Sequence, residues 1–147
     1  MEPTDDQDLS DAIREASSPA WSVRASAGRL LAAASQIEAV AGVLHSLLLD
    51  TQDTAVTSET ATALLARRDL PGLRAVLAAR AQAVDVGTAD QLSAELDGDL
   101  RWITYDGHAE LIQQLQTLTS DADPEVRDEA QRRLSLLRGS DGGLSAD

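Results

Sequence analysis

Two histidines and one acidic cluster are the residues of this chain whose types could support chemistry. His45 and His108 lie far apart in the sequence and cysteine is absent, so a transition-metal site would need carboxylates from several helices to converge. The register of apolar residues around His45 places it on or beside the buried face of a predicted helix, where a packed or groove-edge histidine is expected. His108 is expected to face solvent. We therefore assign neither histidine to a catalytic or metal site.

The densest acidic region surrounds Asp97-Gly98-Asp99. A calcium-binding EF-hand loop needs oxygen ligands at alternating positions and a distal glutamate within a frame of about 12 residues, which this segment does not supply. Helical spacing instead places Glu95 and Asp99 on an exposed face. Two interpretations remain open for this face: a solvated surface, or a docking patch for a basic partner. Paired-carboxylate catalysis is disfavoured because a short stack of helices gives no sign of a deep substrate pocket.

Composition and motifs argue against several classes of function. The sequence has no glycine-rich phosphate loop, nucleophile elbow or kinase-like residue set, so we predict a protein that is not an enzyme and holds no cofactor. The net charge of −13 opposes attraction to nucleic acid or an anionic bilayer and either favours a basic protein partner or simply maintains solubility. The acidic N-terminus lacks the parts of a signal peptide, and no apolar run reaches transmembrane length. A cytoplasmic protein is expected.

Four sets of mainly apolar residues recur along the chain, each with the spacing i, i+4 and i+8. The first residues of successive sets are separated by 33, 36 and 34 positions. The sets are Val23/Ala27/Leu31, Val56/Thr60/Leu64, Leu92/Leu96/Leu100 and Val126/Ala130/Leu134. An amphipathic helix repeated at this period predicts paired helices stacked into a solenoid, because each pair exposes an apolar face that only its neighbours can cover. The first repeat has Asp8 and Glu15 where the others are apolar, as expected of a cap.

Local signals predict eight helices, over residues 6–17, 19–34, 36–50, 54–68, 70–84, 89–104, 107–120 and 124–138. Side chains that can cap a helix, or proline at a first helical position, support several of these starts. These signals are Ser18-Pro19, Asp53, Asp69, Thr88 with Gln91, and Asp123-Pro124. We expect a single domain over residues 1–138, with a capping helix over 1–17 and repeats over 18–138, and a flexible tail over 139–147.

The segment from Leu118 to Ala130, which contains Asp123-Pro124-Glu125-Val126-Arg127, resembles the HEAT-repeat pattern of an apolar helix, an Asp-containing turn, Val-Arg and a small residue. Residues 47–56 resemble the same pattern, and residues 21–27 match its second half. The resemblance spans about residues 18–138. It implies an all-α fold: a right-handed α-solenoid of about four HEAT-like helical pairs, whose second helices line a concave face that usually binds proteins.

The same resemblance suggests that Arg24 and Arg127 bridge adjacent turns through hydrogen bonds to carboxylate or carbonyl groups. An ordinary solvated arginine is the alternative for each. Thr57 and Ser93 occupy the corresponding positions of the middle repeats, so a continuous ladder of such arginines is expected to be interrupted.

Exposed positions of the second helices define the predicted binding surface. Residues assigned to partner binding are Glu59, Glu95, Asp99, Trp102, Tyr105, Asp128 and Glu129. Further expected members of the concave surface are Ser22, Ala25, Ser26, Arg29, Ser58, Thr62 and Arg132. Trp102 and Tyr105 could anchor an interface beside the carboxylates or fill a gap between neighbouring helices, and both interpretations stay open.

These features together predict a non-enzymatic module that binds a protein partner, expected to be basic, through its concave face. One alternative is an immunity-type inhibitor of a toxin or nucleic-acid enzyme. Less favoured alternatives are a HEAT-like DNA glycosylase, which would require a basic stripe in a chain without lysine, and a ligand-modifying enzyme using His45 with a nearby carboxylate.

Overall fold

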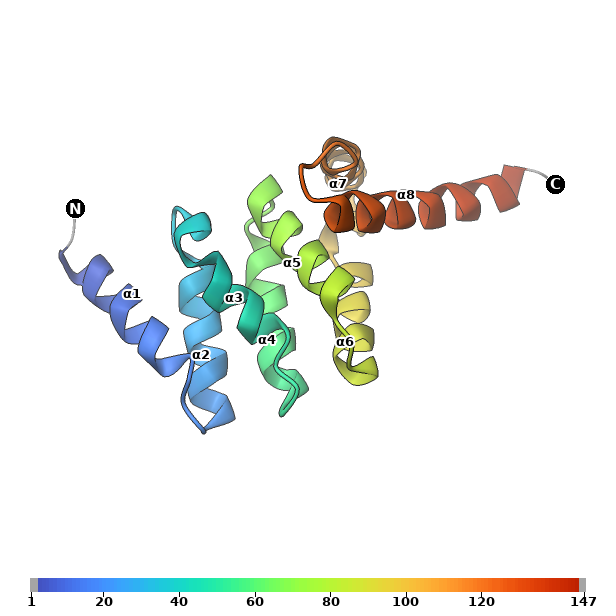
Figure 1. The fold of residues 1–147 in the computed structure, drawn as a ribbon. Helices are drawn as coiled ribbons and strands as arrows, with labels where there is room; N and C mark the ends of the chain where they lie inside the picture. Colours follow the sequence, from blue (N-terminus) through green and yellow to red (C-terminus); the bar gives the residue numbers. More distant parts are fainter. Residues whose placement is uncertain (1–2, 146–147) are drawn as a thin grey trace. The chain divides into compact units, whose positions relative to one another are not determined.

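The structure, a computed structural model, describes the backbone of residues 3–145 and the side chains of residues 7–137. Over this range every regular element is helical, which confirms the all-α prediction (Figure 1). The α-helices are α1 (Pro3–Glu15), α2 (Trp21–Ala32), α3 (Ala41–Leu48), α4 (Thr54–Ala66), α5 (Leu70–Gln82), α6 (Val86–Asp97), α7 (Tyr105–Leu118) and α8 (Pro124–Ser145). Two short 3₁₀ helices are η1 (Ile37–Val40) and η2 (Leu100–Ile103).

The chain divides into two compact units, Met1–Asp99 and Leu100–Asp147, which are called unit 1 and unit 2 below. Unit 1 contains α1 to α6, and unit 2 contains η2, α7 and α8. Each unit has its own buried leucines, such as Leu64 in unit 1 and Leu115 in unit 2. A single domain over residues 1–138 stays a prediction.

Unit 1 is built from alternating helices that contact each other in two rows. Helix α4 packs between α2 and α6, while α3 contacts both α4 and α5, and α1 packs on α2 (Figure 1). The side chains of Val56, Thr60 and Leu64 are fully buried along α4, as their spacing predicted. Helix α4 therefore supplies the centre of the unit 1 core.

Helices α2 and α4 approach each other closely at Gly28. A methyl group added at this glycine would overlap the hydroxyl oxygen of Thr60 on α4 and lie 3.1 Å from its Cβ. The Thr60 hydroxyl is buried and has no hydrogen-bond partner among the described residues. Glycine at position 28 thus sets how closely the two helices pack.

Three of the predicted helix caps are present in the structure. The side chain of Asp53 accepts a hydrogen bond from the Ala55 amide at the start of α4, and Asp69 accepts one from the Gly72 amide at the start of α5. At the start of α8, Asp123 accepts one from the Glu125 amide over 2.9 Å. Each cap satisfies an amide that has no partner inside its helix.

Two other predicted caps are wrong. Helix α2 begins at Trp21 with Ala20 as its N-cap residue, and the Ser18 hydroxyl accepts a hydrogen bond from the Ala20 amide before the helix begins. Helix α6 is capped by Asp85, whose carboxylate accepts from the Thr88 amide over 2.9 Å. Because Asp85 can cap one turn earlier, Thr88 lies inside the helix and is buried.

The prediction of a helix over residues 89–104 is wrong at its C-terminal end. Helix α6 ends at Asp97, Gly98 is its C-cap residue, and the chain continues into the 3₁₀ helix η2. Leu92 and Leu96 are buried as predicted, whereas Leu100 is 77% exposed. Glycine is an unfavourable residue in a helix interior and a common one at its end, which accounts for the break.

Two further boundaries differ from the prediction. Residues expected in a helix over 36–50 form η1 followed by α3, which ends at Leu48. Helix α8 continues past Arg138 to Ser145, so most of the tail expected to be flexible is helical. Residues 146–147 of that tail lie outside the described residues.

Candidate functional site

The predicted partner-binding residues belong to both units. Three of them lie in unit 1: Glu59 on α4, Glu95 on α6 and Asp99 after it. Four lie in unit 2: Trp102 on η2, Tyr105 on α7, and Asp128 and Glu129 on α8. The structure describes two separate groups, so a single groove lined by all seven stays a prediction.

Glu95 lies at the contact between α4 and α6. Its carboxylate accepts hydrogen bonds from the hydroxyls of Ser58 at 2.6 Å and Thr62 at 2.8 Å, and from the Gln91 side chain at 2.9 Å. The side chain is half-buried rather than fully exposed as expected. Helix α4 thus presents two hydroxyl groups to a residue more than 30 positions later, and Glu95 joins the two helices.

Glu59 plays a similar part between α2 and α4, where its carboxylate pairs with Arg29. Both side chains are partly exposed. The two carboxylates of unit 1 that were expected to attract a basic partner are therefore already bound within the unit. A cation docking on Glu59 or Glu95 would compete with these internal contacts.

Glu129 and Ala25 are not surface residues, contrary to the sequence prediction. Glu129 is 2% exposed and lies within 3.7 Å of Arg132 and 3.6 Å of Arg133, while Asp128 beside it is exposed as expected. Glu129 follows Val126 by three residues, so it shares the buried side of α8. Ala25 is buried because α2 contacts α1, α3 and α4 and so has a wide buried side.

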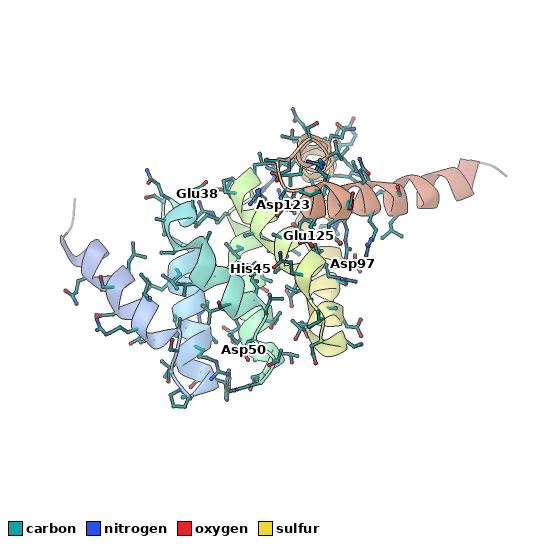
Figure 2. The ribbon with its side chains drawn as sticks, in the orientation of Figure 1. Glu38, His45, Asp50, Asp97, Asp123 and Glu125 are labelled. Carbon is teal, nitrogen blue, oxygen red and sulfur yellow. The ribbon has the colours of Figure 1, made fainter. Side chains whose placement is uncertain are left out.

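Arg24 bridges adjacent turns as the resemblance suggested. Its guanidinium donates to the carbonyls of Ser18 at 2.9 Å and Pro19 at 3.2 Å, and its Nε donates to the Asp50 carboxylate at 2.7 Å. The Arg24 and Asp50 side chains are 8% and 9% exposed. Figure 2 labels Asp50, which lies in the turn between α3 and α4.

Arg127 makes the same carbonyl contacts in unit 2. It donates to the carbonyls of Asp121 at 2.8 Å and Ala122 at 3.3 Å, six and five residues earlier, which is the spacing Arg24 uses. In the second repeat, Thr57 occupies the position that corresponds to Arg24, and its hydroxyl lies 3.4 Å from the Asp50 carbonyl. These arginines hold turns in place, which is a structural role.

His45 is half-buried on α3, where its Nε2 lies 2.9 Å from Oε1 of Gln82 at the end of α5 (Figure 2). This edge position agrees with its expected packed or groove-edge role. His108 on α7 is exposed and meets the ring of Trp102 edge-on, with the ring centroids 5.2 Å apart. Within the described residues, no group of three His, Cys, Asp or Glu side chains is placed to hold a metal ion.

A short segment at the start of unit 2, residues 100–105, has its charged residue inside and its apolar residues outside. Arg101 is 3% exposed and donates to the Gln114 side chain at 2.8 Å, with the Glu110 carboxylate at 3.4 Å. Ile103 is 80% exposed and Tyr105 is 90% exposed, and Leu100 is exposed as described above. Trp102 is half-buried.

Sequence reasoning assigned Trp102 and Tyr105 to this region but missed Leu100, Ile103 and the buried Arg101. One signal was available, because Gly98 and Gly107 flank the segment and glycine disfavours a continuous helix. The Arg101 contacts with α7 could not be foreseen from periodicity. The segment 100–105 is the candidate functional site that the structure adds.

Comparisons of the chain with protein-family models, with curated proteins and with solved structures give no match. The resemblance to HEAT repeats accordingly stays a prediction. In the part of the chain that the structure describes, no helix combines the length and hydropathy needed to cross a membrane.

Proposed function

We propose that this chain is a non-enzymatic protein-binding module, built as a right-handed α-solenoid of HEAT-like helical pairs, whose partner is basic. Two features support the solenoid. The helices of unit 1 alternate between two rows, and Arg24 and Arg127 repeat one pattern of turn contacts about a hundred residues apart. An extended stack of helical pairs offers a large surface to a protein partner.

The proposal rests mainly on one observation: several arginine side chains donate hydrogen bonds inside the protein instead of lying free on its surface. Arg67 donates to the carbonyls of Ala32 at 2.8 Å and Ala34 at 2.6 Å, so it binds the chain just after α2. Arg80 donates to the Ser93 hydroxyl at 2.7 Å, which joins α5 to α6. Together with Arg24, Arg101 and Arg127, these cations hold helices and turns together.

The exposed surface is correspondingly dominated by carboxylates. The sequence has 25 acidic residues against 12 basic ones, and exposed positions include Glu38, Asp85, Asp90, Asp106 and Asp128. Because those five arginines, of the 12 basic residues, are engaged in internal contacts, the field at the surface is more negative than the net charge alone suggests. Such a field accelerates encounter with a basic partner and disfavours acidic ones.

The proposal is tested by capture of partners from lysate of the source organism, with wild-type protein compared against Glu38→Lys/Asp90→Lys/Asp128→Lys. These three positions are exposed and none of them caps a helix in the structure. We expect wild-type protein to retain a basic protein, which is released between about 0.1 and 0.5 M salt and bound at least about tenfold more weakly by the variant. A retained partner that is acidic, or that resists both salt and charge reversal, would refute the proposal.

A further inference from the structure

The exposed residues of segment 100–105 are arranged by the geometry of its 3₁₀ helix. In such a helix, residues three apart lie in line, so Leu100 and Ile103 share one side of η2. Arg101 lies on another side of η2 and Thr104 follows η2, and both engage α7: Arg101 donates to Gln114, and Thr104 caps α7 by accepting from the Gly107 amide at 3.0 Å. The apolar side is exposed because the polar side holds the segment onto α7.

Gly107 fixes this arrangement. A methyl group added there would overlap the Thr104 hydroxyl and would lie 2.8 Å from the Arg101 carbonyl oxygen and 2.9 Å from its Cα. Only glycine lets the backbone of η2 lie so close to α7. The backbone that carries the exposed apolar residues is therefore held in place by buried Arg101, by the Thr104 cap and by the close contact at Gly107.

An exposed Leu, Ile and Tyr within six residues is unusual for a surface that meets only water, because each loses free energy by contacting solvent. A rigid platform makes such residues better contact points, since less side-chain and backbone entropy is lost when a partner binds. Large apolar and aromatic side chains at the centre of an interface commonly supply most of its affinity.

The charge next to the segment selects the partner. Within unit 2, Asp106 directly follows the segment and is exposed, while the guanidinium of Arg101 is buried and lies beside Glu110. An apolar surface beside an exposed carboxylate complements a segment that has apolar side chains on one side and Lys or Arg on the other. An anionic membrane would be repelled by the same carboxylate.

We propose that Leu100, Ile103 and Tyr105 form the contact surface for a cationic amphipathic segment of a protein partner. The sign of the partner's charge rests on the function proposed above, whereas the place of contact rests on the geometry of η2 and α7. The apolar side of the partner covers Leu100 and Ile103, and its cations lie toward Asp106.

Two synthetic peptides of equal positive charge test the inference by calorimetric titration of the full chain. The first is an amphipathic peptide of Leu and Lys, and the second has serine in place of every leucine. We expect the Leu/Lys peptide to bind at least about tenfold more tightly than the Ser/Lys peptide, because only the first can cover the apolar surface. The variant Leu100→Ser/Ile103→Ser/Tyr105→Ser should lower its affinity to that of the Ser/Lys peptide.

A matched control is Val84→Ser/Val86→Ser, which replaces two exposed apolar residues on either side of Asp85 in unit 1. This variant should bind the Leu/Lys peptide as wild-type protein does. Circular dichroism and urea midpoints establish that the serine variants fold, as is expected for substitutions at exposed positions.

Each outcome has a distinct meaning. If both peptides bind wild-type protein equally, or if the triple variant retains the leucine-dependent gain, the contact surface is not segment 100–105 and this inference is wrong, while attraction to a basic partner stands. If neither peptide binds even at low salt, the proposed preference for a basic partner falls as well. If the Val84/Val86 control loses binding to the same extent, the contact lies elsewhere and the inference is again overturned.

Discussion

Replacement of Asp50 with asparagine should lower the free energy of unfolding of unit 1 by about 3 kcal/mol. The Asp50 carboxylate accepts hydrogen bonds from Arg24 Nε at 2.7 Å and Nη2 at 3.3 Å. It also accepts hydrogen bonds from the backbone amides of Gln52 at 3.0 Å and Asp53 at 2.9 Å. Asparagine can keep its single oxygen toward the two amides. Its NH₂ group would then face Arg24 Nε, so two donors meet and a buried guanidinium loses its counter-charge.

The magnitude follows from burial. Removal of one member of a buried ion pair costs about 3–5 kcal/mol, because the remaining buried charge loses its counter-charge. The low end of this range applies because Arg24 keeps its contacts with the carbonyls of Ser18 and Pro19, and the amide contacts of Gln52 and Asp53 survive. Glu59→Gln is the matched control, since the Arg29–Glu59 pair also joins neighbouring helices but its side chains are 50% and 39% exposed. Solvent screens that pair, and a loss below about 0.5 kcal/mol is expected.

Urea unfolding followed by tryptophan fluorescence measures both variants. Trp21 lies in unit 1 and Trp102 in unit 2, so a Trp102→Phe background makes the emission of Trp21 report unit 1. The slope of free energy against urea must be unchanged for the comparison to hold. A loss below about 1 kcal/mol for Asp50→Asn, or a loss equal to that of Glu59→Gln, would refute the view that burial of the Arg24–Asp50 pair determines its contribution.

Three further pairs of substitutions test backbone conformation, packing and the end of α6 by urea unfolding. Arg68 has a φ of 60°, so Arg68→Gly should stabilise unit 1 by about 0.5–1 kcal/mol, whereas Arg68→Ala, which keeps the positive φ unfavourable, should not; equal effects would contradict this. Gly28→Ala should cost about 1–3 kcal/mol and Thr60→Ala should recover most of the loss, and an absence of rescue would mean that the clash lies elsewhere. Leu96→Asp should destabilise unit 1 by about 3 kcal/mol or more, whereas Leu100→Asp, followed by the emission of Trp102 in a Trp21→Phe background, should change the stability of unit 2 by less than about 0.5 kcal/mol. Similar losses from both would mean that Leu100 is buried after all.

Local signals in the sequence predicted much of the helical framework. The side chains of Val56, Thr60 and Leu64 are buried as their spacing requires, because one helix presents every fourth residue to the same neighbour. Asp53 and Asp69 cap the helices that follow them, because a capping contact spans only two or three residues. Features decided within one helical turn were therefore accessible without a structure.

The candidate binding residues were harder to predict because their surroundings come from other helices. Glu95 lies one residue before the buried Leu96, which suggests an exposed carboxylate. Its exposure is reduced by Ser58 and Thr62, which donate from 37 and 33 residues earlier in the sequence. Periodicity describes which side of a helix is apolar, but it does not reveal which polar groups a neighbouring helix will present.

Leu100 is the residue for which helical spacing predicts burial and the structure shows exposure. Its spacing after Leu92 and Leu96 fits a buried position, yet the chain leaves the helix at Gly98 and turns the leucine outward. Burial of Arg101 on α7 requires this turn, since Leu100 and Arg101 lie on different sides of η2 and cannot both face α7. An apolar residue that fits the core pattern but lies in solvent marks a conflict between local pattern and final structure, and such conflicts are expected where a surface is shaped for function. The exposed side of η2, rather than Glu59 and Glu95, is therefore the place at which a partner should be sought.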